Sequence, residues 1–314
     1  MKPAPVTGAG FAVLITVLRI SQTGQTPIYE FQMLEAADPQ EQARGFHVHL
    51  EDADIAALMQ VLLASDGRIQ QLNLSAGSVW IKRQGIEKAP WWIKLQALAA
   101  SALPYKFLKP SPILKPVEMM ERERRRMMEF GAKGFPVPDI IYSSQTAIVI
   151  SDVGPTVQRI LKWKRRAGET DHDALLIDCA AAIGDLHAAS LCHGRPHVRD
   201  FFLRDGRIGF MDFEEEPQAV MPLETAQARD IWLLFLPLCI LAQNGRATLD
   251  AAYQAWASRA PEAAIIELRR LVRVLGRFLP LARLIGRVQM GSDLQRFIVA
   301  TDYLKNAVEP EAAG

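Results

Sequence analysis

The chain has little cysteine, no long apolar run and almost no net charge, and each of these absences excludes a class of protein. Among 314 residues there are three cysteines, which lie far apart and show no Cys-x-x-Cys spacing: Cys179, Cys192 and Cys239. This pattern argues against a zinc site and against a disulfide framework. The simplest interpretation is a protein of a reducing, cytosolic compartment.

The charges nearly cancel, because 36 Lys and Arg residues face 35 Asp and Glu residues and leave a formal net charge of +1. Broad binding to nucleic acid is therefore not expected, and any basic patch must be local. The apolar stretch from Phe11 to Ile20 is too short to span a bilayer and is interrupted by Arg19. No small-residue cleavage site clearly follows it, so we do not expect a signal peptide.

The first 66 residues form a segment whose role the sequence leaves open. Residues 11–20 and 27–33 are apolar and are separated by a turn, which predicts a hairpin, and residues 45–50 alternate like another strand. Asp52 is expected to cap a helix whose apolar residues share one face, namely Ile55, Leu58, Met59, Leu62 and Leu63.

From residue 67 to residue 154 the pattern predicts a strand-rich lobe. Residues 68–74 and 78–83 have the pattern of paired strands, and residues 140–142 and 147–151 that of two short strands. Between these pairs we expect two helices, one in the stretch 91–103 and one over about 117–130, separated by a proline-punctuated linker.

From residue 155 to residue 314 the chain is predicted to be mostly helical. Buried helices are expected at 175–189 and 225–242, with further ones after Pro261 and Ser292. A strand-rich front followed by a helical back predicts an α+β architecture in two lobes.

Polar residues suited to nucleotide and metal binding gather in two neighbouring motifs. The first runs from His193 to Asp200 and includes Arg195, and the second is the Met-Asp-Phe-Glu sequence at 211–214, after a short apolar strand. Together they resemble the catalytic loop and the metal-binding loop of protein-kinase-like phosphotransferases. Over about 67–242, the order and spacing are most similar to the lipopolysaccharide-kinase and KEOPS-kinase-like group of small atypical bacterial kinases. The resemblance implies a two-lobed protein-kinase-like fold.

The resemblance also implies nucleotide-binding roles for three residues outside the two motifs. Lys82 corresponds to the strand lysine that contacts the α and β phosphates of ATP. Glu123 corresponds to the helix carboxylate that pairs with this lysine, with Glu121 as the competing choice. Asp152 lies where the chain of such kinases crosses between the lobes and binds the adenine.

A magnesium site is implied in the same way. Asp212 would be the principal ligand, and Asp200 stands where relatives place a magnesium-binding asparagine, an exchange that keeps a hard oxygen donor. Asp230 resembles the buried aspartate that braces the catalytic loop through its backbone amides. ATP and Mg²⁺ are therefore the implied cofactors.

Two departures from the family pattern bear on activity. No glycine-rich G-x-G-x-x-G loop precedes Lys82, so phosphate coverage would have to come from another segment. Arg195 stands in the position of the usual catalytic aspartate, and a guanidinium group cannot accept a proton.

Catalysis can survive this change, because phosphoryl transfer depends mainly on positioning and charge neutralisation. Asp200 is then the candidate base, with Asp212 and Glu214 left to hold the metal. Arg195, which could stabilise the γ-phosphate, and His193 complete the candidate catalytic set.

Three functional hypotheses follow. The leading one is phosphotransfer from ATP to a hydroxyl group of a sugar lipid or a protein. The alternative is a pseudokinase, a nucleotide-binding or scaffold module in which Arg195 marks the loss of catalysis. The third is a membrane-surface adaptor in which Trp91 and Trp92 lie at headgroup level, together with the arginine-rich helix at 122–126. The expected location is cytoplasmic, and the third hypothesis adds a peripheral contact at the inner face of the membrane.

Each of these residues also has an ordinary structural interpretation. Lys82 taken alone would more often be a solvated strand end, and Glu123 a surface partner of a neighbouring arginine. The arginines at 122–126 would more often form a solvated helix face, and the helix at 91–103 would pack on the small lobe. His193 and His197 lack a third metal ligand, which favours loop-bracing roles.

Overall fold

The computed structural model describes residues 50–64, 67–83, 107, 111–112, 114–288 and 290–308. The expected hairpin at 11–33, most of the strand at 45–50, and the helix with Trp91 and Trp92 lie outside the described residues. The chain divides into two compact units, the first made of residues 1–64 with Leu74–Ala76 and the second of all other residues. The lobe boundaries at 66/67 and 154/155 stay predictions from the sequence.

The described part of the first unit is a helix and a short turn. Helix α1 (Asp52–Ala64) lies where the sequence predicts a helix, but it is Asp54 whose carboxylate accepts a hydrogen bond from Glu51 N, at 3.1 Å. Asp54 also accepts hydrogen bonds from the hydroxyl group of Ser75 and, at 2.8 Å, from Ser75 N, and these two bonds lower the pKa of Asp54. Leu58 is buried but Leu63 is 80% exposed, so the expected apolar face is buried only in part.

An antiparallel sheet forms the strand-rich part of the second unit. Its strands, in the order β1-β2-β4-β3, are β1 (Ile69–Leu74), β2 (Gly77–Arg83), β3 (Ile140–Ser143) and β4 (Ala147–Ser151). Each strand lies within two residues of its predicted position. In the register of β2 and β4, Lys82 stands opposite Ile148, so the lysine belongs to a central strand.

Helix α3 (Pro116–Ala132) packs against β4. It begins with a proline in its first turn, where the missing N–H costs nothing, and Glu118 accepts a hydrogen bond from Lys115 N at 2.9 Å. Its face toward the interior carries Met127 and Phe130, both fully buried. The predicted helix at 117–130 is therefore confirmed, with one extra residue at the start and two at the end.

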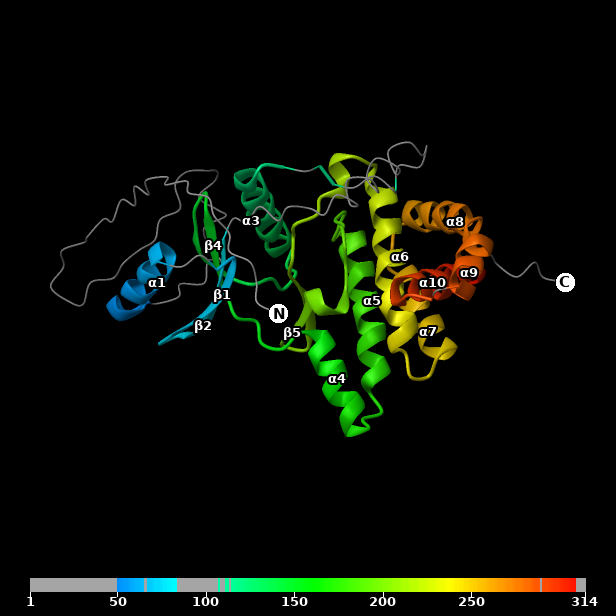
Figure 1. The fold of residues 1–314 in the computed structure, drawn as a ribbon, viewed down its shortest axis with the longest axis horizontal. Helices are drawn as coiled ribbons and strands as arrows, with labels where there is room; N and C mark the ends of the chain where they lie inside the picture. Colours follow the sequence, from blue (N-terminus) through cyan, green and yellow to red (C-terminus); the bar gives the residue numbers. More distant parts are fainter. Residues whose placement is uncertain are drawn as a thin grey trace. The chain divides into compact units, whose positions relative to one another are not determined.

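The rest of the chain is mostly helical, as expected. Figure 1 shows α5 beside α6, with α8 and α10 packed on α6 and α7 packed on α5. The helices are α4 (Val157–Ala167), α5 (His172–Ala188), α6 (Leu223–Leu241), α7 (Arg246–Ala257), α8 (Glu262–Gly276), α9 (Leu279–Val288) and α10 (Ser292–Val308). The segment after Pro261 forms two helices, with the break at Arg277–Phe278 just before Pro280. In the described ranges, no helix is both long and apolar enough to cross a membrane.

A second, two-stranded sheet carries the candidate loops. The short helix η3 (Val198–Asp200) leads into β5 (Phe201–Arg204), which pairs with β6 (Arg207–Phe210). Asp205 and Gly206 join these strands with φ of 51° and 73°, as a two-residue hairpin turn requires. The fold is thus α+β, with a strand-rich lobe and a helical lobe, as predicted.

Candidate functional site

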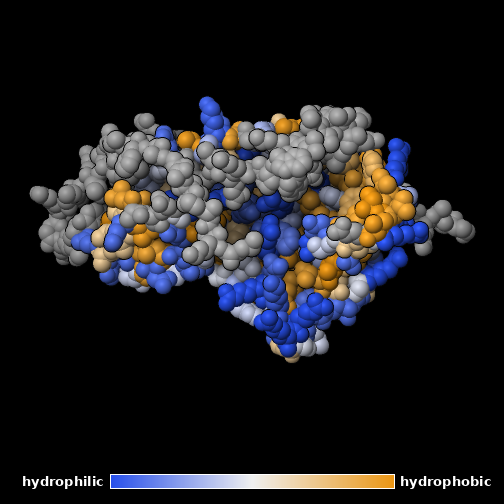
Figure 2. Space-filling view, viewed as in Figure 1, coloured by the Kyte–Doolittle hydropathy of each residue, from blue (hydrophilic) through white to orange (hydrophobic). Residues whose placement is uncertain are grey.

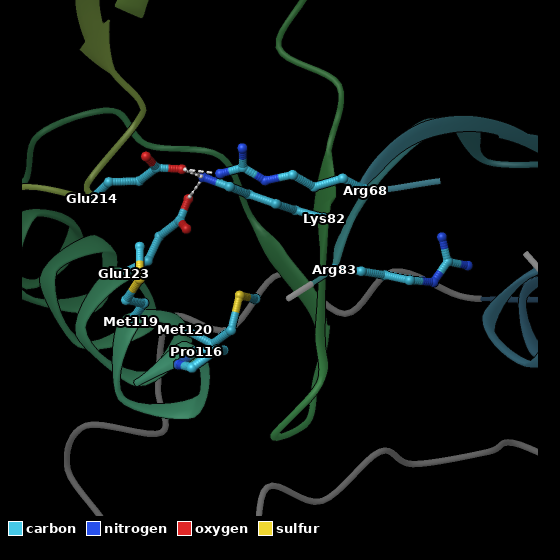
Figure 3. A pocket seen from close by; sticks show the side chains of 8 residues that line it. All are labelled: Arg68, Lys82, Arg83, Pro116, Met119, Met120, Glu123 and Glu214. Atoms are coloured by element: carbon cyan, nitrogen blue, oxygen red, sulfur yellow. Dashed lines mark hydrogen bonds and ion pairs between the residues drawn. The ribbon is translucent and has the colours of Figure 1, made fainter. Parts of the chain in front are cut away.

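Lys82 lies between two carboxylates (Figure 3). Its Nζ is 2.8 Å from Glu123 Oε1 on α3 and 2.7 Å from Glu214 Oε1 in the loop after β6. Arg68 Nη2 lies 3.2 Å from the same Glu214 oxygen. These residues line a small pocket together with Arg83, Pro116, Met119 and Met120.

The two carboxylate partners of Lys82 differ in how deeply they are buried. The Glu123 side chain is 5% exposed and that of Glu214 is 28% exposed. Burial raises the pKa of Glu123. Burial also acts to lower the pKa of Lys82, but the charges of Glu123 and Glu214 outweigh it, and the pKa of the lysine is raised. Lys82 is therefore held as a cation, with one inner and one outer carboxylate.

Asp230 on α6 fixes the loop that contains the first motif. Its carboxylate accepts hydrogen bonds from His193 N and, at 2.8 Å, from Gly194 N. Gly194 has φ +100°, and a Cβ there would lie 2.8 Å from Glu215 Cβ, so a side chain could not be accommodated without a shift. This arrangement is the one that the resemblance implied for Asp230.

Asp212 has a left-handed backbone conformation, with φ of 66°. Its neighbours explain why the conformation is kept. Met211 N donates to Asp200 O at 3.0 Å, and Phe213 is fully buried, with its ring 4.7 Å from Phe130 and 5.9 Å from His193 between centroids. Non-glycine residues in this conformation cost of order 1–3 kcal/mol and gather at functional sites. The packing of Phe213 holds Asp212 in this conformation.

Asp200 and Asp212 form a candidate pair of metal ligands. Asp200 Oδ2 is buried and has no hydrogen-bond partner among the residues that the structure describes, and Arg199 Nε lies 3.3 Å from Oδ1. Burial, and then the charge of Asp212, raise the pKa of Asp200 to about 7. The described residues hold no cluster of three or more His, Cys, Asp or Glu that could bind a metal by itself. Mg²⁺ commonly uses one or two protein carboxylates with phosphates and water, so the two aspartates fit this ion.

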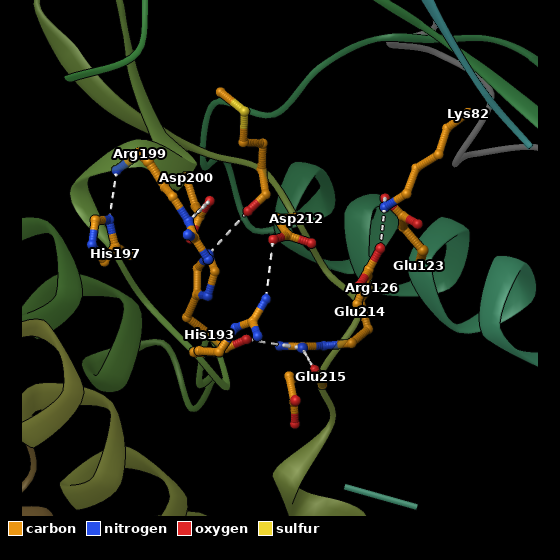
Figure 4. A network of polar contacts seen from close by, with 12 residues as sticks. Lys82, Glu123, Arg126, His193, His197, Arg199, Asp200, Asp212, Glu214 and Glu215 are labelled. Carbon is orange, nitrogen blue, oxygen red and sulfur yellow. Dashed lines mark hydrogen bonds and ion pairs between the residues drawn. The ribbon is translucent and has the colours of Figure 1, made fainter. Parts of the chain in front are cut away.

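Arg195 lies beside Asp212. Its Nη2 is 3.6 Å from Asp212 Oδ2, and half of its side chain is exposed. Figure 4 labels Asp212 together with Asp200, His193 and Lys82 of the candidate site. The guanidinium thus places a positive charge next to the principal candidate ligand.

His193 and His197 occupy structural positions. His193 is 1% exposed, and its Nε2 lies 3.1 Å from Met211 O. Within the described part of the chain its Nδ1 has no hydrogen-bond partner. Burial lowers the pKa of His193 to about 4, so the ring is neutral and Nε2 donates to the carbonyl. His197 Nδ1 accepts from Arg199 N at 3.1 Å. These contacts match the loop-bracing interpretation, and a direct catalytic role of His193 stays a prediction.

Asp152 lies where the chain passes from β4 to α4. It accepts from Gly154 N at 2.8 Å and from Gln71 Nε2 at 3.0 Å, and its own N–H donates to Ser78 O at 3.0 Å. These bonds tie the crossing segment to β1 and β2. A role in adenine binding stays a prediction.

Arg126 of α3 has a role at this site that the sequence did not predict, and its side chain is buried, with 3% exposed. Its guanidinium donates to the carbonyls of Cys192, His193 (3.0 Å) and Glu215. The interpretation of residues 122–126 as a solvated face is therefore wrong for Arg122, Glu123 and Arg126, all of which are buried. A signal was present, because Glu123, Arg126, Met127 and Phe130 follow the spacing of a single helix face.

Two comparisons with known proteins bear on this site. Residues 114–234 match the model of the lipopolysaccharide kinase (Kdo/WaaP) family. An uncharacterized protein of Haemophilus influenzae is 27% identical over 174 residues, which is 55% of this chain and 64% of that protein. The family match includes Glu123, the two motifs and Asp230, and leaves Lys82 outside. The kinase-like resemblance is thus confirmed: over residues 114–234 this chain is similar to the lipopolysaccharide kinase (Kdo/WaaP) family.

Proposed function

We propose that this protein is an ATP- and magnesium-dependent phosphotransferase that acts on a hydroxyl group, with a sugar lipid favoured over a protein as the acceptor. The observation that carries the proposal is the buried pairing of Lys82 with Glu123 at 2.8 Å, in the same compact unit as the left-handed Asp212. The preference for a sugar lipid rests on the match to the lipopolysaccharide kinase family.

Each residue then has a defined part. Lys82 would bind the nucleotide phosphates, while Glu123 keeps the lysine in place. A phosphate would compete with Glu214 for Lys82, because Glu214 is the more exposed of the two carboxylate partners. Asp212 would be the principal ligand of Mg²⁺, which supplies charge neutralisation for phosphoryl transfer. With Asp200 acting as the base, Glu214, once displaced from Lys82, would be the second carboxylate near the metal.

In the proposed reaction, the acceptor oxygen forms a bond to the γ-phosphorus while the bond from that phosphorus to the bridging oxygen breaks. ADP leaves, and the proton of the hydroxyl group passes to a base. Asp200 is the candidate for this base, because Arg195 cannot accept a proton. Arg195 instead provides a positive charge beside Asp212, where it can stabilise the transferred phosphoryl group.

One observation favours the alternative, a pseudokinase. The ion pair between Arg195 and Asp212 places a cation where a metal ion would have to bind. If a metal ion cannot replace Arg195 beside Asp212, the protein would bind nucleotide or act as a scaffold, and it would not transfer phosphate.

Transfer of label from γ-³²P ATP tests the proposal, with dephosphorylated lipopolysaccharide and a membrane protein extract as separate acceptors. We expect magnesium-dependent label in the lipid, lost in Asp212→Asn. Asp205→Asn is the matched control, because Asp205 is an aspartate with a similar left-handed φ of 51° in an exposed turn. Nucleotide binding without label in either acceptor would favour the pseudokinase, and label that persists in Asp212→Asn would contradict the assigned site.

A further inference from the structure

Helix α9 turns most of its apolar side chains outward. Its buried residues are Leu279 and Ala282, and its main contacts are with α10. The exposed fraction is 57% for Leu281, 58% for Leu284 and 50% for Ile285, and it reaches 89% for Val288. Phe278, just before the helix, is 40% exposed. We call these five exposed residues the α9 surface.

The exposed residues form one continuous stripe. Phe278, Leu281, Ile285 and Val288 are spaced by three, four and three residues, which places them on the same side of a helix. Figure 2 shows a hydrophobic area over the region where Figure 1 draws α8 and α9, with hydrophilic residues at its margin. A contiguous stripe of large exposed apolar residues marks a surface that contacts another phase or partner.

The chain segment that contains this surface carries charges of one sign. Between Leu268 and Ser292 the sequence contains six arginines and no aspartate or glutamate. Arg283 is paired with Asp302 of α10 at 2.7 Å. Arg277 and Arg287 are exposed and make no ion pair with any residue in the described part of the chain. The α9 surface is therefore apolar with a positively charged margin.

This combination selects an anionic lipid surface over a second copy of the chain. A two-fold dimer would place the same patch on both copies, and the arginines of one would face those of the other with no acidic partners in the segment. A helix with an apolar stripe and flanking arginines can instead insert its apolar side chains among acyl chains while the guanidinium groups contact anionic headgroups.

We propose that the α9 surface binds the protein peripherally to a membrane that contains anionic lipids. The helix would lie in the plane of the membrane, with Leu281, Leu284, Ile285 and Val288 toward the acyl chains. This site is distinct from Trp91 and Trp92, and it goes beyond the proposed function, because it requires neither nucleotide nor an acceptor.

Co-sedimentation of the full chain with vesicles, without nucleotide, tests this proposal. Vesicles of phosphatidylcholine with about one-third phosphatidylglycerol are compared with vesicles of phosphatidylcholine alone. We expect binding to the anionic vesicles and a loss of at least about tenfold in affinity for Leu281→Gln/Ile285→Gln, since both side chains lose their apolar burial. Arg277→Gln/Arg287→Gln should weaken binding by about fivefold per arginine at low salt.

The matched control is Leu63→Gln/Met128→Gln, which removes two apolar side chains that are 80% and 42% exposed on other helices. It should bind like the natural protein, and circular dichroism of every variant checks that folding is retained. The proposal is overturned if the natural protein does not bind anionic vesicles. It is equally overturned if Leu281→Gln/Ile285→Gln binds the vesicles normally, and this holds whether or not Trp91→Ala/Trp92→Ala abolishes binding. It is also overturned if the only effect of Leu281→Gln/Ile285→Gln is to dissociate a dimer.

Discussion

The guanidinium of Arg195 lies 3.6 Å from the carboxylate of Asp212, at the position where the kinases that this chain resembles carry a catalytic aspartate. The contact between these two residues bears directly on the choice between a phosphotransferase and a pseudokinase. Asp212 combines a strained backbone with a charge beside Asp200, whose pKa is raised first by burial and then by Asp212. Neither feature favours folding, and the proposed binding of a metal ion would give both a function.

Replacing Asp212 separates the strain from the function. Asp212→Gly and Asp212→Ala both remove the carboxylate and its contact with Arg195, but only glycine adopts φ of 66° without steric cost. We expect Asp212→Gly to be about 1 kcal/mol more stable than Asp212→Ala in urea denaturation. Both variants should lose any magnesium-dependent response to ATP. Equal stability of the two variants would show that the backbone at this position is not strained.

The two carboxylate partners of Lys82 have opposite predicted effects on nucleotide binding. Glu214→Gln removes the outer carboxylate, so the affinity for ATP should rise by about twofold to fivefold, the effect expected for a partly exposed ion pair. Glu123→Gln should weaken binding, because Lys82 loses its buried partner.

Titration with a fluorescent ATP analogue measures both effects, with Glu216→Gln as the control, since Glu216 pairs with the exposed Arg125 instead. Weaker binding by Glu214→Gln would instead support the earlier expectation that Glu214 is a metal ligand.

At the level of elements, buried polar side chains join segments far apart in the chain. Arg126 connects α3 to the loops before β5 and after β6 through three carbonyl groups, and its guanidinium lies 5.5 Å from the ring centre of Phe130. Asp173, at the start of α5, accepts hydrogen bonds from Gln243 N (3.0 Å), Asn244 N (2.7 Å) and Thr248 Oγ1. In each case one charged group satisfies several backbone or hydroxyl groups that would otherwise be unpaired.

Truncating Arg126 should therefore be costly. Arg126→Met leaves two buried carbonyls and one partly buried carbonyl without this donor, and we expect a loss of about 3 kcal/mol in the free energy of unfolding. Arg126→Lys should recover only part of this, because an ammonium group cannot reproduce the planar arrangement of donors. Arg125→Ala on the same helix is the control and should change stability by less than about 1 kcal/mol. A similar small effect for Arg126→Met would refute the bracing role.

Asp173 predicts a pH dependence of stability. Burial acts to raise its pKa, but the hydrogen bonds from Gln243, Thr248 and Asn244 outweigh it and hold the pKa well below its usual range. A carboxyl group with a lowered folded-state pKa contributes stability above about pH 4, and this contribution is lost as the pH falls further.

Asp173→Asn should cost about 2 kcal/mol at pH 7, and the difference from the natural protein should shrink between pH 4 and pH 2. Urea denaturation across this range measures it, with Asp205→Asn in the exposed turn between β5 and β6 as control. A difference that stays constant with pH would contradict the assignment.

The sequence predicted those elements whose signals are local. The strands β1 to β4 and helix α3 follow from alternation, turn residues and a helix-start proline, which act within a few residues. The burial of Arg126 and the contact of Glu214 with Lys82 depend on segments brought together by the fold, and no local pattern specifies such contacts. Helix α9 was missed as a separate helix, and its outward apolar face contradicts the usual expectation that apolar periodicity marks a buried side.

At the scale of the whole molecule, charge is segregated although the total is nearly zero. The net charge of +1 gave no reason to expect an anionic partner, yet six arginines without an acidic residue lie between Leu268 and Ser292. Around the candidate nucleotide site, Asp200, Asp212 and Glu214 instead lie next to cations, with Lys82 and Arg195 each in an ion pair. The two proposals thus assign an anionic lipid surface to α9 and nucleotide with magnesium to the candidate site.

Thermal unfolding with and without millimolar ATP and Mg²⁺ tests the central claim most directly, because a ligand that binds only the folded state raises the midpoint. For a ligand at about one hundred times its Kd we predict a magnesium-dependent rise of about 5 °C. The rise should be absent in Lys82→Met and Asp212→Asn and retained in Asp205→Asn. No shift in the natural protein, or the same shift in all four proteins, would contradict a nucleotide site formed by Lys82 and Asp212.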